Sequence, residues 1–353
     1  MMFADKVLLV LGGTGSLGQA LVRRLLSGEQ GKPRKVIVFS RDEAKQHEMR
    51  LAYLHQPFST DEVILDNFRR SLEFRIGDVR DLASLREAMR GVDYVFHAAA
   101  LKQVPTCEYF PEQALKTNAQ GAELLVQAAI EEQPLAVVGL STDKACQPVN
   151  VMGMTKALQE RILVAANLRS AATRFLNVRY GNVLASRGSM LPLFREQIRR
   201  GGPVTLTHSE MTRFFLSLDQ AVDCIFAALA EASPGEIYVP HLPSARIAWI
   251  AEALCKARNI PIIVTGVRPG EKIHEQLVSV EEGYRTVRRG DYLVIQPALP
   301  ELVTTRGQAC LNQAYCSSQA PMNRAETLQL LEQHGYLKGS PTSAELATGT
   351  PQD

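Results

Sequence analysis

The chain has 353 residues, more than a usual single domain, so a large core with an attached smaller lobe is expected. Hydrophobic residues make up 46% of it and charged residues 22%, as in ordinary globular proteins. Its 39 Lys and Arg residues nearly balance its 37 Asp and Glu residues, which argues against nucleic acid or a membrane surface as a general partner.

The remaining compositional signals predict neither a metal site nor export. The 6 cysteines form no CxxC pair and no Cys/His ligand spacing, so no metal site and no disulfide framework is expected. The apolar run KVLLVLGG near the N-terminus is too short to span a bilayer and lacks a basic flank and a cleavage site. We therefore expect a cytoplasmic protein with no membrane segment.

Buried strands alternate with helical segments through the first half of the chain. Apolar strands are expected at 6–11, 35–40, 71–77, 92–100 and 135–141, with helical periodicity between them. Strands that are apolar throughout and alternate with amphipathic helices are typical of a parallel sheet covered on both faces. The sequence therefore predicts an α/β fold with a doubly wound parallel sheet of the Rossmann type.

A smaller C-terminal lobe is expected to follow, because Pro and Gly punctuate the pattern after Gly188. We assign residues 1–180 to the Rossmann domain, which also receives about 215–240, and residues 181–214 and 241–336 to the lobe. A terminal helix should begin at Asn323, with Glu326 completing its cap. Residues 337–353 lack apolar periodicity and are predicted to be a disordered tail.

The stretch GGTGSLG lies directly between a predicted strand and a predicted helix, with glycines in GxGxxG register. This context lets the backbone approach a pyrophosphate that is held at the helix N-terminus. The Rossmann domain is therefore expected to bind a dinucleotide. Its contacts at this turn should come from Gly12, Thr14, Gly15, Ser16 and Leu17.

The end of the second strand indicates which dinucleotide is bound. It carries Ser40 and Arg41, with Lys45 one turn further on, where NAD-specific sites place an acidic residue. A hydroxyl and a guanidinium suit a 2′-phosphate better than a bare diol, so NADP is favoured over NAD, although Asp42 lies close by. Later strand ends should add Asp78, Val79, Ala98, Ala99 and Ala100.

A hydroxyl, an acid and a base follow the fifth strand, at the edge where doubly wound sheets bind ligands. These are Thr142, Asp143 and Lys144, with Lys156 on the next helix. A lysine can act as a base here only if its pKa is lowered, which burial beside Lys156 and a cationic ring would do. A salt-bridged loop without chemistry is the alternative for Asp143 and Lys144.

Taken together, the motifs resemble the extended short-chain dehydrogenase/reductases. More narrowly, residues 4–295 are similar to the UDP-N-acetylglucosamine 4,6-dehydratases of bacterial surface-glycan and nonulosonate pathways. The resemblance implies NADP as cofactor, UDP-N-acetylglucosamine as substrate and a homo-oligomer. It rests on GGTGSLG, FSRDEAKQ, GDVRD, FHAAALKQVP, STDKA, NVMGMTK, RYGNVLASRGSMLPLF, VTLTHSEMTRFF and RPGEKIHEQL, in that order.

The resemblance implies a closed redox cycle on one hexose. Hydride leaves carbon 4 for NADP, water is lost across carbons 5 and 6, and the hydride returns to carbon 6, giving a UDP-4-keto-6-deoxy-N-acetylhexosamine. Thr142 would bind the 4-hydroxyl, Asp143 would protonate the leaving hydroxyl, and Lys144 would be the base at carbon 5. Lys156 would bind the nicotinamide ribose. Inversion or retention at carbon 5 stays open, as does uridine against guanosine.

The smaller lobe should hold the sugar nucleotide. Arg213 and Arg268 are the candidate cations for the diphosphate, and Glu271 could hold the ribose hydroxyls. Asn182 is a candidate amide partner for the sugar or the uracil. Lys102, just after the fourth strand, is also expected near the substrate.

Met152 is the main departure from the family pattern, because related families carry a catalytic tyrosine there and methionine has no ionisable group. We expect Asp143 or Lys144 to accept the proton of the 4-hydroxyl instead, with Thr142 orienting that hydroxyl. Two alternatives stay open. One is a nucleotide-sugar 4-epimerase, which needs no acid-base pair for elimination, and the other is a protein that binds NADP without catalysis.

Overall fold

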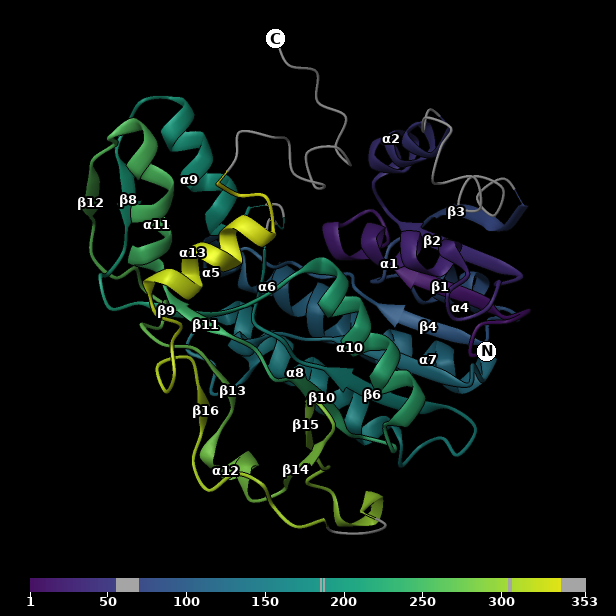
Figure 1. Cartoon of the computed structure of the whole chain (residues 1–353). Helices are drawn as coiled ribbons and strands as arrows, with labels where there is room; N and C mark the ends of the chain where they lie inside the picture. The colour runs from purple at the N-terminus through teal and green to yellow at the C-terminus, as the bar shows by residue number, and fades with distance from the viewer. Residues whose placement is uncertain (55–69, 185, 187, 304–306, 338–353) are drawn as a thin grey trace.

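The computed structural model describes residues 1–54, 70–184, 186, 188–303 and 307–337. Within them, one large sheet forms the centre of the molecule, in the order β14-β15-β10-β6-β5-β4-β1-β2-β3 (Figure 1). The expected tail therefore lies outside the described residues, apart from Leu337. The strands are β1 (Val7–Leu11), β2 (Lys35–Ser40), β3 (Leu72–Ile76), β4 (Tyr94–His97), β5 (Ala136–Leu140), β6 (Arg174–Val178), β10 (Ile237–Pro240), β14 (Thr286–Arg289) and β15 (Tyr292–Ile295).

The strands from β10 to β3 are parallel, and β15 and β14 add to the β10 edge in antiparallel fashion. The chain order reverses between β1 and β4, and this switch point opens the crevice in which doubly wound sheets bind ligands. The predicted fold class is confirmed: the protein is an α/β Rossmann fold with a mostly parallel sheet.

Helices cover both faces of the sheet, as its fully buried strands require. On one face α1, α2 and α10 pack into a core with Leu8, Val10 and Val36. On the other face α4, α7 and α8 pack into a second core with Leu9 and Ile37. These helices are α1 (Ser16–Ser27), α2 (Glu43–Leu54), α4 (Leu82–Met89), α7 (Gly121–Glu132), α8 (Val151–Ala166) and α10 (Leu218–Glu231).

Short helical segments connect β4 to α7, and single turns occur elsewhere. The π-helix η1 (Leu115–Gln120) continues directly into α7. The other short segments are α5 (Val104–Tyr109), α6 (Pro111–Ala114), η2 (Asp143–Ala145), η3 (Lys256–Arg258), α12 (Val280–Gly283) and η4 (Pro300–Leu302).

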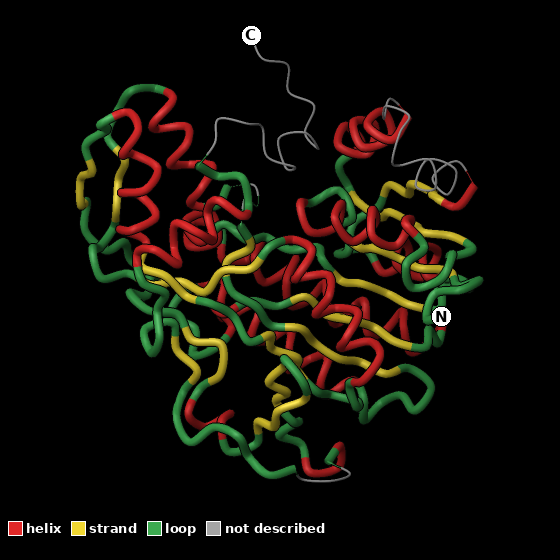
Figure 2. The backbone as a smooth tube through the Cα atoms, viewed as in Figure 1, coloured by secondary structure: helices red, strands yellow, loops and turns green. Residues whose placement is uncertain are grey.

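The smaller lobe has its own core and lies to one side of the large sheet (Figure 2). In its three small sheets β9 lies between β7 and β11, β8 pairs with β12, and β13 pairs with β16. Its elements are β7 (Asn182–Val183), α9 (Met190–Arg199), β8 (Val204–Leu206), β9 (Thr212–Leu216), β11 (Ser244–Arg246), α11 (Ile247–Cys255), β12 (Ile262–Val264), β13 (Gln276–Val278), β16 (Tyr315–Cys316) and α13 (Arg324–Gln333).

The observed division of the chain differs from the expected one in one respect. The segment 241–336 was assigned to the lobe, yet its strands β14 and β15 extend the large sheet. The apolar YLVI of β15 pairs with the otherwise open edge of β10, which covers that edge. The capping box predicted between Asn323 and Glu326 is confirmed at the start of α13. No described helix is long and apolar enough to cross a bilayer.

Candidate functional site

The glycine-rich turn between β1 and α1 brings the backbone close to the switch point. Gly12 has φ of +78°, and a Cβ built there would lie 2.7 Å from Ala99 N on the neighbouring strand end. A Cβ at Gly18 would lie 2.5 Å from the carbonyl oxygen of Gly12. Gly15, the N-cap of α1, supplies no capping side chain, so the first-turn N–H groups are left for an anion.

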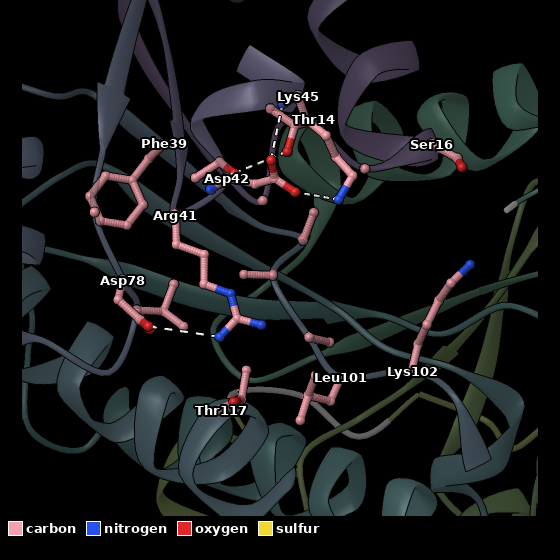
Figure 3. A pocket seen from close by; sticks show the side chains of 18 residues that line it. Thr14, Ser16, Phe39, Arg41, Asp42, Lys45, Asp78, Leu101, Lys102 and Thr117 are labelled. Atoms are coloured by element: carbon pink, nitrogen blue, oxygen red, sulfur yellow. Dashed lines mark hydrogen bonds and ion pairs between the residues drawn. The ribbon is translucent and has the colours of Figure 1, made fainter. Parts of the chain in front are cut away.

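A cavity of about 320 Å³ opens over this turn (Figure 3). Of the predicted cofactor residues, all but Leu17 and Lys156 line it. Leu17 instead packs against the core beneath the sheet. Lys102, expected near the substrate, also lines this cavity. The lining residues that the motifs did not identify are Phe39, Asp42, Gly77, Leu101 and Thr117.

Thr117 is the clearest of these omissions. Its side chain is buried, and its hydroxyl has no hydrogen-bond partner among the described residues. It lies within the π-helix η1, whose extra residue per turn shifts side chains relative to an α-helix. Sequence periodicity does not report such a shift, so this position was not predicted.

Cationic and acidic side chains share the end of β2. Lys45 is paired with Asp42, and Arg41 reaches toward Asp78 with 3.9 Å between Nη1 and Oδ2 (Figure 3). Ser40 Oγ lies 3.0 Å from Thr14 Oγ1. The residues predicted to favour NADP therefore stand at the cavity with two carboxylates beside them.

The loop after β5 places a buried acid beside a half-buried base. Asp143 is 1% exposed, and its Oδ1 accepts hydrogen bonds from Thr142 Oγ1 at 2.9 Å and from Lys144 Nζ at 3.1 Å. Lys144 Nζ also pairs with Glu275 Oε1 at 3.2 Å. Asp143 is thus enclosed by protein, and the charged group of Lys144 lies between two carboxylates.

This environment contradicts the expected lowering of the Lys144 pKa. Burial disfavours the ammonium form, but the carboxylates of Asp143 and Glu275 outweigh burial, and the pKa of Lys144 is raised. The second carboxylate was not anticipated because Glu275 stands far along the chain. Its motif, RPGEKIHEQL, was noted without a role for this residue.

Lys156 has the lowered pKa that was expected for Lys144. Its buried Nζ donates to Leu140 O and to Gln159 Oε1, both at 2.6 Å. Burial lowers the pKa of Lys156 to about 8, against the opposing charge of Glu160. Burial, together with the charge of Lys156, also lowers the pKa of His97 to about 3. Through its hydrogen bond to Leu140 O, Lys156 holds α8 to the end of β5.

Met152 is buried in a small apolar cluster. It packs with Cys107 and Ala114, against Val104 and Val151, from the helices that precede α7 and from α8 itself. The first turn of α8 lies tightly on the loop after β5, since a Cβ at Gly153 would lie 2.3 Å from the carbonyl oxygen of Lys144. The position of the family tyrosine is thus adjacent to Lys144 but offers no titrating group.

The predicted substrate residues fall into two groups. Arg213 is buried, and its guanidinium donates to the carbonyl oxygens of Thr212, Ile273 and Lys272. Arg268 and Lys102 are exposed. Asn182 Oδ1 and Glu271 Oε2 are buried without a hydrogen-bond partner in the described part of the chain. Buried unpaired oxygens of this kind suit donors from a ligand.

The sequence profile of the polysaccharide biosynthesis protein family matches residues 8–297. The chain is similar to a UDP-glucose 4-epimerase of Rickettsia canadensis, with 47% identity over 297 residues, 82% of this chain and 83% of the relative. A protein of the same name from Rickettsia conorii is 46% identical over the same length.

Solved structures agree in fold. Pen from Bacillus thuringiensis aligns with a TM-score of 0.82 and 33% identity over 94% of this chain and 100% of Pen. DesIV, a dTDP-glucose 4,6-dehydratase from Streptomyces venezuelae, aligns with a TM-score of 0.64 and 24% identity over 76% of this chain and 86% of its own. The chain therefore belongs to the polysaccharide biosynthesis protein family and has the Rossmann fold of the short-chain dehydrogenase/reductases.

Proposed function

We propose that the protein is a nucleotide-sugar 4,6-dehydratase that converts UDP-N-acetylglucosamine to a UDP-4-keto-6-deoxy-N-acetylhexosamine. The observation that carries the proposal is the pair of the buried Asp143 and the half-buried Lys144, whose charged groups lie 3.1 Å apart at the carboxyl end of β5. Removing a proton and a hydroxyl from adjacent carbons needs a base and an acid within one site. This pair, at the edge where ligands bind, meets that need.

The cofactor proposed for this cycle is NADP. The glycine turn, the uncapped start of α1 and the unpartnered hydroxyl of Thr117 suit a bound dinucleotide, and Ser40, Arg41 and Lys45 suit its 2′-phosphate. When bound, a nicotinamide dinucleotide supplies reversible hydride storage, so oxidation at carbon 4 and reduction at carbon 6 balance within one turnover.

The side chains of the loop would handle the protons. Thr142 would orient the 4-hydroxyl, and Asp143, whose Oδ2 is buried without a described partner, would take its proton. Asp143 would then give this proton to the departing 6-hydroxyl. Lys144 would remove the carbon 5 proton and later return it. This scheme needs no tyrosine at position 152, which fits the apolar surroundings of Met152.

The substrate would lie between this loop and the smaller lobe. Asn182 and Glu271 each keep a buried oxygen available for ligand donors, and Arg268 and Lys102 are exposed cations suited to a diphosphate. Arg213 is committed to backbone carbonyl oxygens, so we propose that it shapes the site beside Lys272 and Glu275.

A direct assay tests the function. The purified protein is incubated with UDP-N-acetylglucosamine and NADP, and the product is analysed by mass spectrometry and NMR. We expect loss of one water, a ketone at carbon 4 and a methyl group at carbon 6. Asp143→Asn should abolish this product while dinucleotide binding persists. A product of unchanged mass would refute the dehydratase proposal.

The names of the Rickettsia relatives favour a second candidate, a UDP-glucose 4-epimerase. An epimerase keeps the 6-hydroxyl and inverts only carbon 4, so its product has the mass of the substrate. Parallel incubation with UDP-glucose and UDP-N-acetylglucosamine separates the two candidates. Tight dinucleotide binding with no conversion of either sugar would instead indicate a non-catalytic protein.

A further inference from the structure

Glu275 is a buried carboxylate that the proposed proton scheme does not use. It is 2% exposed and lies immediately before β13. Its backbone is fixed on both sides by Ser317: Glu275 N donates to Ser317 Oγ at 3.0 Å, and Ser317 N donates to Glu275 O at 2.9 Å. Ser317 lies beyond residue 297, where the family profile match ends.

Lys144 stands between two such carboxylates. Its Nζ is 3.1 Å from Asp143 Oδ1 and 3.2 Å from Glu275 Oε1, and Arg213 Nε is 3.8 Å from the same Glu275 oxygen. The second oxygens, Asp143 Oδ2 and Glu275 Oε2, are buried and lack hydrogen-bond partners among the described residues. Unpaired buried carboxylate oxygens are costly, and a proton or a ligand donor would satisfy them.

This arrangement conflicts with the idea that Lys144 acts alone as the base at carbon 5. Two carboxylates keep its side chain in the ammonium form, and an ammonium group cannot take a proton from carbon. Asp143 is already engaged with the two hydroxyl groups in the proposed reaction. Glu275 is the remaining neighbour that can accept a proton from Lys144 directly, because hydrogen-bonded contact already joins their charged atoms.

We propose that Glu275 is the proton-accepting partner of Lys144, so that the two side chains act together as the base in the dehydration. The inference rests on the proposed function. In this proposal Glu275 acts through Lys144, so it is a positioning and proton-accepting residue.

The proton transfers balance as follows. An N–H bond of Lys144 breaks and an O–H bond forms on Glu275, which leaves a neutral amine. The amine takes the carbon 5 proton, and the C–H electron pair moves toward the carbon 4 ketone as an enolate. The C–O bond at carbon 6 then breaks, and the proton from Asp143 completes the water. After hydride has returned to carbon 6, Lys144 returns its proton to carbon 5 and recovers one from Glu275.

The test compares the wild type with Glu275→Gln, which keeps the size of the side chain but accepts no proton. Mixed with UDP-N-acetylglucosamine, the NADP-loaded variant should still form reduced nicotinamide, seen by its absorbance. Its release of dehydrated product should fall by about 100-fold or more, the scale of general base catalysis. Glu275→Asp, which keeps a carboxylate, should recover part of the lost rate.

Glu236→Gln provides the matched control. Glu236 is also 2% exposed, and its carboxylate is paired with Arg289 at the β14 edge of the large sheet, away from the loop after β5. The expected result is a lower melting temperature with an unchanged rate of product release. If Glu275→Gln instead loses dinucleotide binding and both half-reactions equally, its role is structural and the proposal is overturned.

A rate equal to or above that of the wild type also overturns the proposal, since loss of one carboxylate alone would make Lys144 neutral more readily. The pKa of Lys144 can be measured by NMR of the lysine-labelled holoenzyme. This measurement distinguishes failure of the inference from failure of the proposed function. Asp143, Glu275 and Arg213 are the charged groups that face Lys144. The pKa should fall in Glu275→Gln, and an unchanged pKa overturns the coupling whether or not the wild type dehydrates the sugar.

Discussion

The Nζ of Lys156 donates a 2.6 Å hydrogen bond to the carbonyl oxygen of Leu140, the last residue of β5. This contact joins α8 to the point where the loop with Asp143 and Lys144 begins. Because Lys156 is buried, its pKa is lowered from 10.5 to about 8. The charge of this side chain therefore changes in an accessible pH range.

Lys156 should make stability depend on pH above about 8. Between that value and 10.5 the unfolded chain holds a proton on Lys156 that the folded chain has lost, so the unfolding free energy rises with pH. Relative to Lys156→Met, the wild type should gain about 1.4 kcal/mol per pH unit across this window. Urea unfolding of both proteins at several pH values measures the slope, and parallel curves would contradict the lowered pKa.

Replacing Gly12 should weaken dinucleotide binding. Gly12→Ala places a Cβ 2.7 Å from Ala99 N at φ of +78°, so the turn must shift away from the switch point. We expect affinity for NADP to weaken by at least about tenfold, as measured by calorimetry. Gly202→Ala is the control, because a Cβ there meets no atom within 4 Å. Equal binding by both variants would show that the turn does not hold the cofactor.

Arg41 should discriminate between the two dinucleotides. Its guanidinium lines the cavity at the end of β2, where a 2′-phosphate would be recognised. Arg41→Ala should weaken NADP binding by roughly tenfold to 100-fold, the value of a charged hydrogen bond, with little effect on NAD. Arg200→Ala, which alters a surface ion pair with Glu196, serves as control. Equal losses for NADP and NAD would argue against recognition of the 2′-phosphate.

Restoring the family tyrosine should bring little benefit. In Met152→Tyr a phenol enters an apolar cluster. We expect the dehydration rate to change by less than about threefold, because in the proposed mechanism the loop supplies both the acid and the base. Stability should fall by about 1–3 kcal/mol if the hydroxyl stays unpaired. Met154→Tyr, at a 52% exposed position of the same helix, should have little effect. A large gain in rate would mean that the present base is inefficient.

Most of the cavity at the glycine turn was predictable because its residues are local to strand ends. Gly12, Ser40, Asp78 and Ala99 each lie at or just after the end of a strand, and parallel strands deliver their ends to one edge. Leu17, also expected at the cofactor, does not line the cavity, because a residue on a helix beside the turn can face the core as well as the ligand. Placement on an element does not define the direction of a side chain.

The sequence by itself determined the fold class, the glycine turn and the close succession of Thr142, Asp143 and Lys144, since these depend on local periodicity and neighbouring residues. Only the tertiary structure decided that Glu275 meets Lys144 and that β14 and β15 extend the large sheet. Those contacts join distant segments, and no local pattern encodes them. The charge of Lys144 therefore follows from the packing of the smaller lobe against the Rossmann domain, because its pKa depends on which carboxylates come within reach.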